Sequence, residues 1–553
     1  MPHPLIFLAI TVVIATSIVN TISNILAKRR RLENLQASFG KPPTPNDLLQ
    51  LESISQYTQY FEANNPSQQR VDAITWNDLD MDRVFNRINV CQTSVGEEYL
   101  YHVLHELPLN SDALARREDL IQFFHDNPEL RLKIQHLMGS RLEKENYNGL
   151  TSLMFAPTGS LLKHRHIYTA LAILPILLGF VLFISVPIGV IGMILSFVVN
   201  MIIHYRTKRR IAVEIPSIKY LTSLLRCCKG LRKIKEIAHL PIMQEIKRHH
   251  KTLKSIQRKV PAMTSMTGDI AETFLEYGYI MFLSDIRNYN KFMKTLKKRS
   301  EDFHALYRAF GELELSICLL SFRQSLPVYT LPEFTAKNTG IEFTEIYHPL
   351  ISAPVTNSGL IDNCSLITGS NASGKSTFIK ALAINGILAQ TINTCAAKSF
   401  KSHFALIMTS MVTRDDLTAG DSYFVVEIKS LKRILGMVKK YPCICYIDEI
   451  LRGTNTIERI AASASVLSYL HSQNALCVAA SHDIELTSIL KDIYVNYHFS
   501  EQITDSDINF DYKLKNGPST TRNAIKLLSY MGFPEQVVAS AEGLAYMEHE
   551  QNS

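Results

Sequence analysis

The stretch Ile-Thr-Gly-Ser-Asn-Ala-Ser-Gly-Lys-Ser-Thr, residues 367–377, decides the fold of the C-terminal part of this chain. It follows an apolar run typical of a strand and opens an apolar-periodic segment that predicts a helix. Two glycines separated by four residues and followed by Lys and Ser form a phosphate-binding pattern. Such a loop directs its amides and the helix N-terminus at phosphate oxygens. The stretch therefore predicts a nucleotide site in an α/β domain.

Each position of this loop has an expected role. Gly369 and Gly374 permit the tight turn, Lys375 reaches the β and γ oxygens, and Ser376 ligates Mg²⁺. ATP and Mg²⁺ are the expected ligands. The predicted nucleotide contacts in the loop are Gly369, Ser370, Asn371, Ala372, Ser373, Gly374, Lys375, Ser376 and Thr377.

Two further apolar runs end in polar side chains. The run from Cys443 ends at Asp448 and Glu449, which predicts that a buried strand delivers Asp448 to Mg²⁺ and Glu449 to the attacking water. The run 475–480 is followed by Ser-His-Asp, and His482 there would sense the γ-phosphate and help hold the water. A lone histidine is more often a surface or core residue, but the order of the motifs favours a catalytic role.

Length and composition bound the organisation of the chain. With 553 residues the chain exceeds one hydrophobic core, so two to four domains are expected. The net charge of +7 permits nucleic acid or anionic lipid as a partner without requiring either. The nine cysteines show no metal-ligand spacing, which favours buried, reduced thiols on the cytoplasmic side.

Two tracts predict membrane helices. Residues 5–27 are largely apolar and uncharged and end at the basic run 28–31, which predicts one span with its C-terminal end in the cytoplasm. A cleaved signal peptide would carry its basic residues before the apolar run instead. Residues 167–203 carry no formal charge and are interrupted at 185–189, which predicts a hairpin of two spans; a buried core hairpin is the alternative. The expected location is a multi-pass membrane protein with about three spans.

From about Val328 short β-rich runs alternate with helical ones, as in a parallel-sheet domain. The segments before it are helical in period. The expected parts are an N-terminal transmembrane helix (1–31), a linker (32–74), a helical core domain (75–162), a transmembrane helical hairpin (163–210), a second part of the helical core or lever domain (211–329) and a cytoplasmic nucleotide domain (330–553).

Four motifs in order resemble those of the MutS family of DNA mismatch repair ATPases. Residues 369–377 resemble the phosphate loop of this family, and residues 415–427 resemble its signature stretch. Residues 448–456 resemble its Mg²⁺ and dimer-contact motif, and Ser481-His482 resembles the segment with its switch histidine. The resemblance implies a P-loop NTPase domain of the ABC/MutS type, an all-α helical core and lever domain, and in this chain added transmembrane helices.

The resemblance reaches further at both ends. Tyr347-His348-Pro349 is similar to an Arg-His-Pro segment that precedes the nucleotide site, with Tyr347 in place of the Arg, which implies that His348 contacts the nucleotide. Tyr512 falls where an adenine-contacting side chain is expected. The similarity is strong over 330–545, moderate over 80–140 and 300–330, and absent elsewhere.

In this family the signature serine of one subunit completes the site of the other. The resemblance therefore implies a homodimer through the ATPase domain, with Ser422 acting in trans and Glu449 and His482 acting in cis with Lys375. DNA and an unidentified protein are the further expected partners.

The departures from the family pattern limit the function that is expected. Mismatch recognisers insert an aromatic wedge from an N-terminal mixed domain, and the region before the helical core resembles no such domain. The leading hypothesis is a membrane-anchored ATPase that drives dimer closure and lever motion, related to mismatch repair or recombination. An ABC-type transporter is one alternative, although no Leu-Ser-Gly-Gly-Gln lies between Lys375 and Asp448. A membrane scaffold that uses ATP as a conformational ligand is the other.

Overall fold

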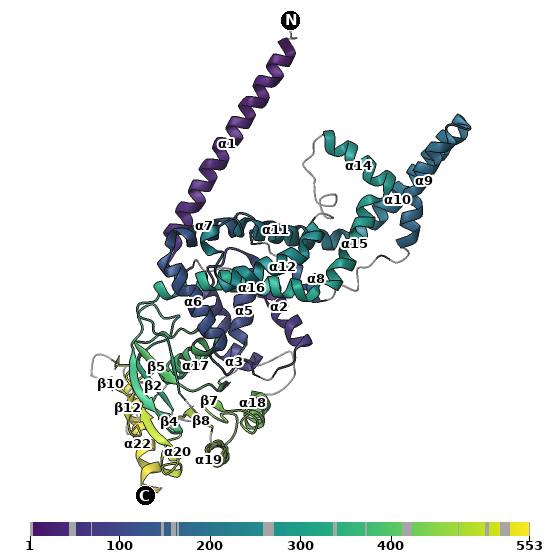
Figure 1. The fold of residues 1–553 in the computed structure, drawn as a ribbon. Helices are drawn as coiled ribbons and strands as arrows, with labels where there is room; N and C mark the ends of the chain where they lie inside the picture. The colour runs from purple at the N-terminus through teal and green to yellow at the C-terminus, as the bar shows by residue number, and fades with distance from the viewer. Residues whose placement is uncertain are drawn as a thin grey trace.

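A helical body with two helical projections lies on an α/β domain in the computed structural model (Figure 1). Helix α1 (Pro4–Ser38) and the pair α9 (Arg165–Val181) and α10 (Val186–Ile211) both leave the body on the side away from the α/β domain. The structure describes residues 4–43, 51–67, 69–144, 149–155, 162, 165–257, 270–335, 340–370, 373–411, 423–473, 475–503, 508–519 and 531–551.

A six-stranded sheet in the order β12-β9-β4-β8-β7-β6 forms the centre of the α/β domain. Its strands are β4 (Ser365–Thr368), β6 (Leu406–Ser410), β7 (Cys443–Asp448), β8 (Leu476–Ala480), β9 (Val495–His498) and β12 (Lys515–Asn516). All pairings are parallel except that of β12 with β9. The carboxyl ends of β4, β7 and β8 therefore meet at one edge, where Asp448 is in register with Ala480.

Smaller sheets and helices complete this domain. A second sheet has the order β1-β5-β2-β3, from β1 (Glu333–Phe334), β2 (Ile341–Ile346), β3 (Asn357–Ile361) and β5 (Ser399–Ser402), and β10 (Glu501–Ile503) pairs with β11 (Ile508–Phe510). The helices are α17 (Lys375–Ile392), α18 (Tyr423–Met437), α19 (Thr456–Ser472), α20 (Glu485–Ile489) and α22 (Glu535–Gln551). Because α17 is apolar on nearly every face, it is buried along most of its length. The α/β architecture expected after about residue 330 is confirmed.

Helix α16 (Ser300–Gln324) is the axis of the helical body and is buried along most of its length. Around it lie α2 (Leu51–Asn64), α3 (Ala73–Asp78), α4 (Met81–Ile88), α5 (Ser94–His105), α6 (Asp112–Asp126), α7 (Pro128–Gly139), α8 (Leu150–Phe155), α11 (Ile215–Leu231) and α12 (Pro241–Gln257), while α14 (Ile270–Phe282) and α15 (Ser284–Lys298) lead to the α9–α10 pair.

Helix α2 lies inside the segment 32–74, which the sequence analysis assigned to a linker. Tyr57 of this helix is fully buried, and its ring stacks on that of Tyr307 in α16 with the centroids 4.8 Å apart. The helix also packs against α5. Its buried positions Ile54, Tyr57 and Thr58 stand among Ser and Gln residues, so the apolar stripe is too narrow to be conspicuous in the sequence.

The apolar helices support the membrane prediction only in part. Within the described residues one helix, α10, is long and apolar enough to cross a membrane. The apolar stretch His166–Val181 is shorter, and 16 or 17 helical residues reach only about 25 Å of the roughly 30 Å needed. The expected multi-pass location with about three spans is thus supported for one helix. The break between α9 and α10 covers residues 182–185 and so meets the start of the interruption at 185–189 that the sequence predicted.

Two arginines join the helical body to the C-terminal end of α17. Arg117 donates from Nη1 to the carbonyl of Thr391 at 2.6 Å. Arg323 makes two hydrogen bonds to the Glu118 carboxylate, at 2.7 and 2.8 Å, and donates to the hydroxyl of Thr394 at 2.9 Å. Because α17 begins at the phosphate loop, these contacts link the loop to the body through one rigid helix.

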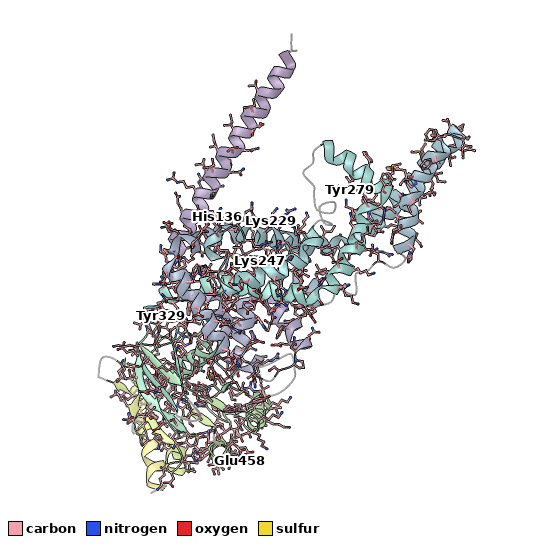
Figure 2. The ribbon with its side chains drawn as sticks, viewed as in Figure 1. His136, Lys229, Lys247, Tyr279, Tyr329 and Glu458 are labelled. Atoms are coloured by element: carbon pink, nitrogen blue, oxygen red, sulfur yellow. The ribbon has the colours of Figure 1, made fainter. Side chains whose placement is uncertain are left out.

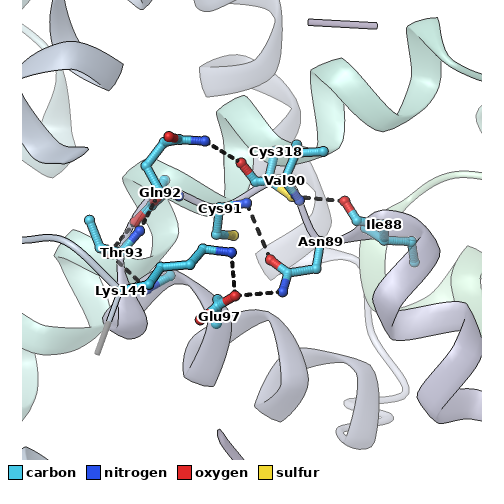
Figure 3. A network of polar contacts seen from close by, with 11 residues as sticks. Ile88, Asn89, Val90, Cys91, Gln92, Thr93, Glu97, Lys144 and Cys318 are labelled. Carbon is cyan, nitrogen blue, oxygen red and sulfur yellow. Dashed lines mark hydrogen bonds and ion pairs between the residues drawn. The ribbon is translucent and has the colours of Figure 1, made fainter. Parts of the chain in front are cut away.

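A buried polar network fixes the loop before α5 (Figure 3). Asn89 donates to the Glu97 carboxylate at 2.8 Å, and the Lys144 ammonium is paired with the same oxygen. The amide of Cys91 donates to the Asn89 side chain at 3.2 Å, and the Cys318 thiol donates to the carbonyl of Ile88. Because buried polar groups are costly unless paired, this network specifies the position of α5 against α16.

Glu314 of α16 makes the stability of the helical body depend on pH. Its buried carboxylate accepts from the amide of Thr93 at 3.0 Å and contacts Gln92, and burial raises its pKa to about 7. The unfolded carboxyl ionises near pH 4.5, so its contribution to stability is complete below that pH and is lost as pH rises towards 7, by about 3 kcal/mol. We expect Glu314→Gln to melt at a higher temperature than the native chain at pH 8, with a smaller difference at pH 5.

The fluorescence of Trp76, the single tryptophan and a buried one, follows this melt. Glu301→Gln in the exposed first turn of the same helix is the control and should show no such pH dependence. An equal effect of Glu314→Gln at both pH values would contradict the raised pKa.

Candidate nucleotide site

A pocket of about 450 Å³ opens at the carboxyl edge of the main sheet. It brings together predicted site residues from segments far apart in the sequence: His348, Ser370, Gly374, Lys375, Ser376, Thr377, Glu449 and Tyr512. Phe378, Ala381 and Phe499 add apolar lining. The pocket therefore combines a cationic side chain with apolar lining, as a nucleotide requires.

The loop closes around the ammonium of Lys375. This side chain is 4% exposed, and its Nζ donates to the carbonyls of Gly369 at 2.7 Å and Ser370 at 2.6 Å. The Ser373 hydroxyl also donates to the Ser370 carbonyl, at 2.8 Å. The buried ammonium therefore lies inside the loop, at the N-terminus of α17. Asn371 and Ala372, also predicted as contacts, lie outside the described residues, as does Ser422.

Both glycines of the motif are required by their conformation. Gly369 has φ of 141°, and a Cβ there would lie 2.5 Å from the carbonyl oxygen of Phe499. Gly374 has φ of 100°, and its Cβ would lie 3.0 Å from the ring of Tyr512. The tyrosine ring thus lies over the turn, where only a glycine leaves room for it.

The two carboxylates follow each other at the end of β7. The amide of Glu449 donates to the carbonyl of Ala480 at 3.0 Å, and Glu449 has φ of 55°. A glutamate in the left-handed region is strained, and such strain concentrates at functional sites. Asp448 is 7% exposed, and its Oδ1 has no hydrogen-bond partner among the described residues.

Ser376 and Asp448 fit a hydrated magnesium ion. An orphaned buried carboxylate oxygen and a hydroxyl at the head of α17 are hard oxygen donors, which Mg²⁺ prefers. In the described part of the chain no group of three or more His, Cys, Asp or Glu side chains could hold a metal. Water and phosphate oxygens would have to complete the coordination, as is usual for Mg²⁺ in phosphoryl transfer.

His482 lies against the second carboxylate. Its Nε2 is 2.6 Å from Oε1 of Glu449. Burial lowers the pKa of His482, and the charges of Lys375 and Arg452 lower it further, which favours the neutral ring. The neighbouring Asp483 is held by the guanidinium of Arg459 on α19 at 2.6 and 2.9 Å. This ion pair fixes the turn that carries the histidine.

Two residues of the site were not predicted from the sequence. Arg452 pairs with the Glu449 carboxylate, and its place three residues later in the same motif was the only signal. Asn357 of β3 holds the Tyr512 segment, because its side chain donates to the Tyr512 carbonyl at 3.0 Å and accepts from the amide of Leu514 at 2.8 Å. Nothing in the sequence around Asn357 indicated this role.

His348 and Tyr512 also line the pocket. The Nδ1 of His348 accepts from the amide of Leu350 at 3.3 Å, and burial lowers the pKa of His348 to about 4. Tyr512 is 41% exposed, so one side of its ring is open. A neutral imidazole and a half-exposed phenol ring suit contact with a planar base.

The comparison with protein families matches residues 365–547 to MutS domain V. The matched segment contains the loop, both carboxylates, His482 and Tyr512.

Similar proteins come from archaea, mammals and bacteria. The chain is 26% identical over 343 residues to DNA mismatch repair protein MutS 2 of Haloarcula marismortui, which covers 56% of this chain and 35% of that protein. It is 32% identical over 269 residues to human MutS protein homolog 4, covering 45% of this chain and 28% of the relative. It is 33% identical over 181 residues to DNA mismatch repair protein MutS of Streptococcus equi subsp. equi, and this match covers 32% of this chain and 21% of the relative. The matches thus span about a third or less of each relative's length.

Proposed function

This chain is a MutS-family protein, and from that premise we propose that it is a membrane-anchored ATPase that hydrolyses ATP with Mg²⁺. One observation carries the proposal: the loop lysine and Glu449, which follows β7, line one pocket, and His482, which follows β8, contacts Glu449. A buried ammonium, a carboxylate and a histidine placed together are the groups that ATP hydrolysis requires.

Lys375 would bind the triphosphate. It now donates to two neutral carbonyls, and phosphate oxygens are stronger acceptors because they carry charge. The amides of the loop and the N-terminus of α17 would add to this binding. Mg²⁺, held by Ser376 and Asp448, would neutralise charge on the phosphates when bound. Tyr512 and His348 would contact the adenine.

Glu449 would act as the general base. A water oxygen attacks the γ-phosphorus, the bond to the ADP oxygen breaks, and the water proton passes to the Glu449 carboxylate. His482 and Arg452 contact this carboxylate and would hold it towards the γ-phosphate.

Dimer closure is the next step of the proposal. Ser422 of a second copy would complete the site in trans, and closure would pull on α17. Because Arg117 and Arg323 fix the far end of α17, the helical body would move as a lever. DNA or a protein would be the partner that this motion acts on, and the two relatives named for mismatch repair favour DNA.

The anchoring rests on the apolar projections. Helix α10 has the length and composition of a span, and α1 leaves the body on the same side. The α/β domain lies on the other side and would face the cytoplasm. The division of the chain into six parts, with the ATPase domain at 330–553, belongs to the same proposal.

The test is the ATPase rate of the full chain in lipid nanodiscs, with and without duplex, mismatched or branched DNA across a salt series. We expect Mg²⁺-dependent turnover and, if DNA is the partner, stimulation that falls steeply with salt. ATP-driven uptake of a substrate into vesicles would favour a transporter instead. Tight ATP binding without turnover, even with DNA, would favour a scaffold.

Tyr512 gives a second test. Loss of a stacking ring costs about 1–3 kcal/mol, so Tyr512→Ala should raise the KM for ATP roughly tenfold while kcat changes little. Tyr512→Phe keeps the ring and is the matched control. Equal KM values for the two variants would exclude stacking on the base.

A further inference from the structure

We propose that the exposed face of α11 binds the head groups of anionic lipids. Three basic residues lie on this face, and we call them the basic stripe: Lys219, Arg226 and Lys229. The inference rests on the proposed membrane anchoring and adds a lipid class and a surface to it.

Helix α11 connects the bases of the two projections. It follows α10 directly, through the short helix Ala212–Glu214. Its other end lies against α7, since Arg141, which follows α7, donates to the carbonyl of Arg226 at 2.7 Å. Helix α7 in turn holds the base of α1, where Arg31 donates to the carbonyl of Gly139 and pairs with Glu143 at 2.9 Å. Lys229 and His136 lie on the side from which α1 rises (Figure 2).

The helical period places the stripe on one face. Positions 219, 226 and 229 lie within about 80° of each other around the helix axis, because successive residues turn by about 100°. All three side chains are exposed, and none is in an ion pair with a described residue. The opposite face is buried in the body, with Leu221, Leu224, Leu225, Cys228 and Leu231. Every charged residue in 215–235 is basic.

Positive charge is concentrated in this part of the chain. Residues 206–254 hold fourteen Lys and Arg against three Glu, a net charge of +11. The whole chain carries +7, so the remainder carries −4. The basic excess is therefore a local property of the segment that follows the apolar hairpin, together with the basic run 28–31 at the base of α1.

This placement favours lipid over nucleic acid as the polyanion. When α10 enters the bilayer, α11 begins within one short turn of the membrane surface. Basic groups immediately cytoplasmic of a span meet the anionic surface within a Debye length, and each contributes about fivefold in affinity. Lys229 of the stripe lies on the side of the projections, away from the α/β domain (Figure 2).

The experiment measures lipid enrichment around α11 by energy transfer. The full chain carries Ser223→Cys on α11, and a donor dye reacts there because all nine native cysteines are buried. It is reconstituted in phosphatidylcholine vesicles with a minor fraction of phosphatidylglycerol, and either lipid carries the acceptor on its head group. We expect a roughly twofold or greater excess of transfer to phosphatidylglycerol at 0.1 M NaCl that disappears at 1 M, where the Debye length is about 3 Å.

The variant K219Q/R226Q/K229Q should lose this excess, and K401Q/K432Q/K491Q, which removes three exposed lysines of the α/β domain, should keep it. No excess in the native chain, or an excess that survives in the first variant, overturns the proposal. Loss of duplex DNA binding in that variant with an unchanged lipid excess would assign the stripe to nucleic acid and also overturn it.

Vesicle flotation separates this inference from the anchoring. A chain that floats with neutral vesicles after a carbonate wash but shows no lipid excess is anchored, and only the inference fails. A chain that floats only with anionic vesicles, through the basic stripe, supports the inference and contradicts the anchoring. A chain that floats with neither contradicts both.

Discussion

Replacing Glu449 by Gln is expected to lower the ATP turnover of the full chain by about 10²–10⁴-fold while ATP binding persists. The amide keeps the shape of the side chain and its contact with His482, 2.6 Å away, but it cannot accept the proton of the attacking water. Because the side chain is 7% exposed and lines the pocket, solvent cannot replace it as the base. Phosphate release in the steady state and equilibrium binding of a fluorescent ATP analogue measure the two effects separately.

The control for this prediction is Glu458→Gln. Glu458 belongs to the same region but is exposed in the first turn of α19, where it accepts from Thr454 at 3.1 Å. The Glu458→Gln chain should turn over ATP within a factor of about two of the native rate. Turnover that survives in Glu449→Gln would remove this residue from the reaction.

Replacing Lys375 by Ala is expected to weaken ATP binding by at least about 100-fold and to abolish turnover. Hydrogen bonds to charged groups contribute about 1.5–3 kcal/mol each, and this ammonium would make more than one to the phosphates. Its present contacts to Gly369 and Ser370 show that it already reaches the interior of the loop. Isothermal titration with ATP and Mg²⁺ gives the change directly.

Lys380→Ala is the matched control, because it removes an ammonium from the same helix. Lys380 pairs with Asp80 at 3.1 Å and does not line the pocket. The affinity of the Lys380→Ala chain for ATP should stay close to that of the native chain. A melt followed by Trp76 fluorescence shows whether Lys375→Ala still folds, and a folded variant that binds ATP normally would reject the loop as the phosphate site.

The local parts of the site could be predicted from the sequence because short motifs carry their own geometry. A glycine at φ of 100° and a lysine one residue later are needed wherever this loop forms, so Gly374 and Lys375 are evident without a structure. The strand before Asp448 was recognisable for the same reason, since a buried parallel strand is a continuous apolar run.

The parts that depend on long-range packing could not be predicted. Asn357 lies 155 residues from Tyr512, and only the folded sheet brings its amide to that backbone. Arg117 and Glu314 are charged residues whose burial follows from partners in other helices. Of the three expected spans one is supported within the described residues, because the helices divide the tract 167–203 unequally and only α10 is long enough to cross a membrane.

The most direct test of the account is a cryo-electron microscopy map of the Glu449→Gln chain in nanodiscs with saturating ATP and Mg²⁺. We expect a triphosphate along residues 369–377, its γ-phosphate between Lys375 and residue 449, and an adenine beside Tyr512. A map in which this pocket is empty, or in which the nucleotide lies elsewhere, would contradict it.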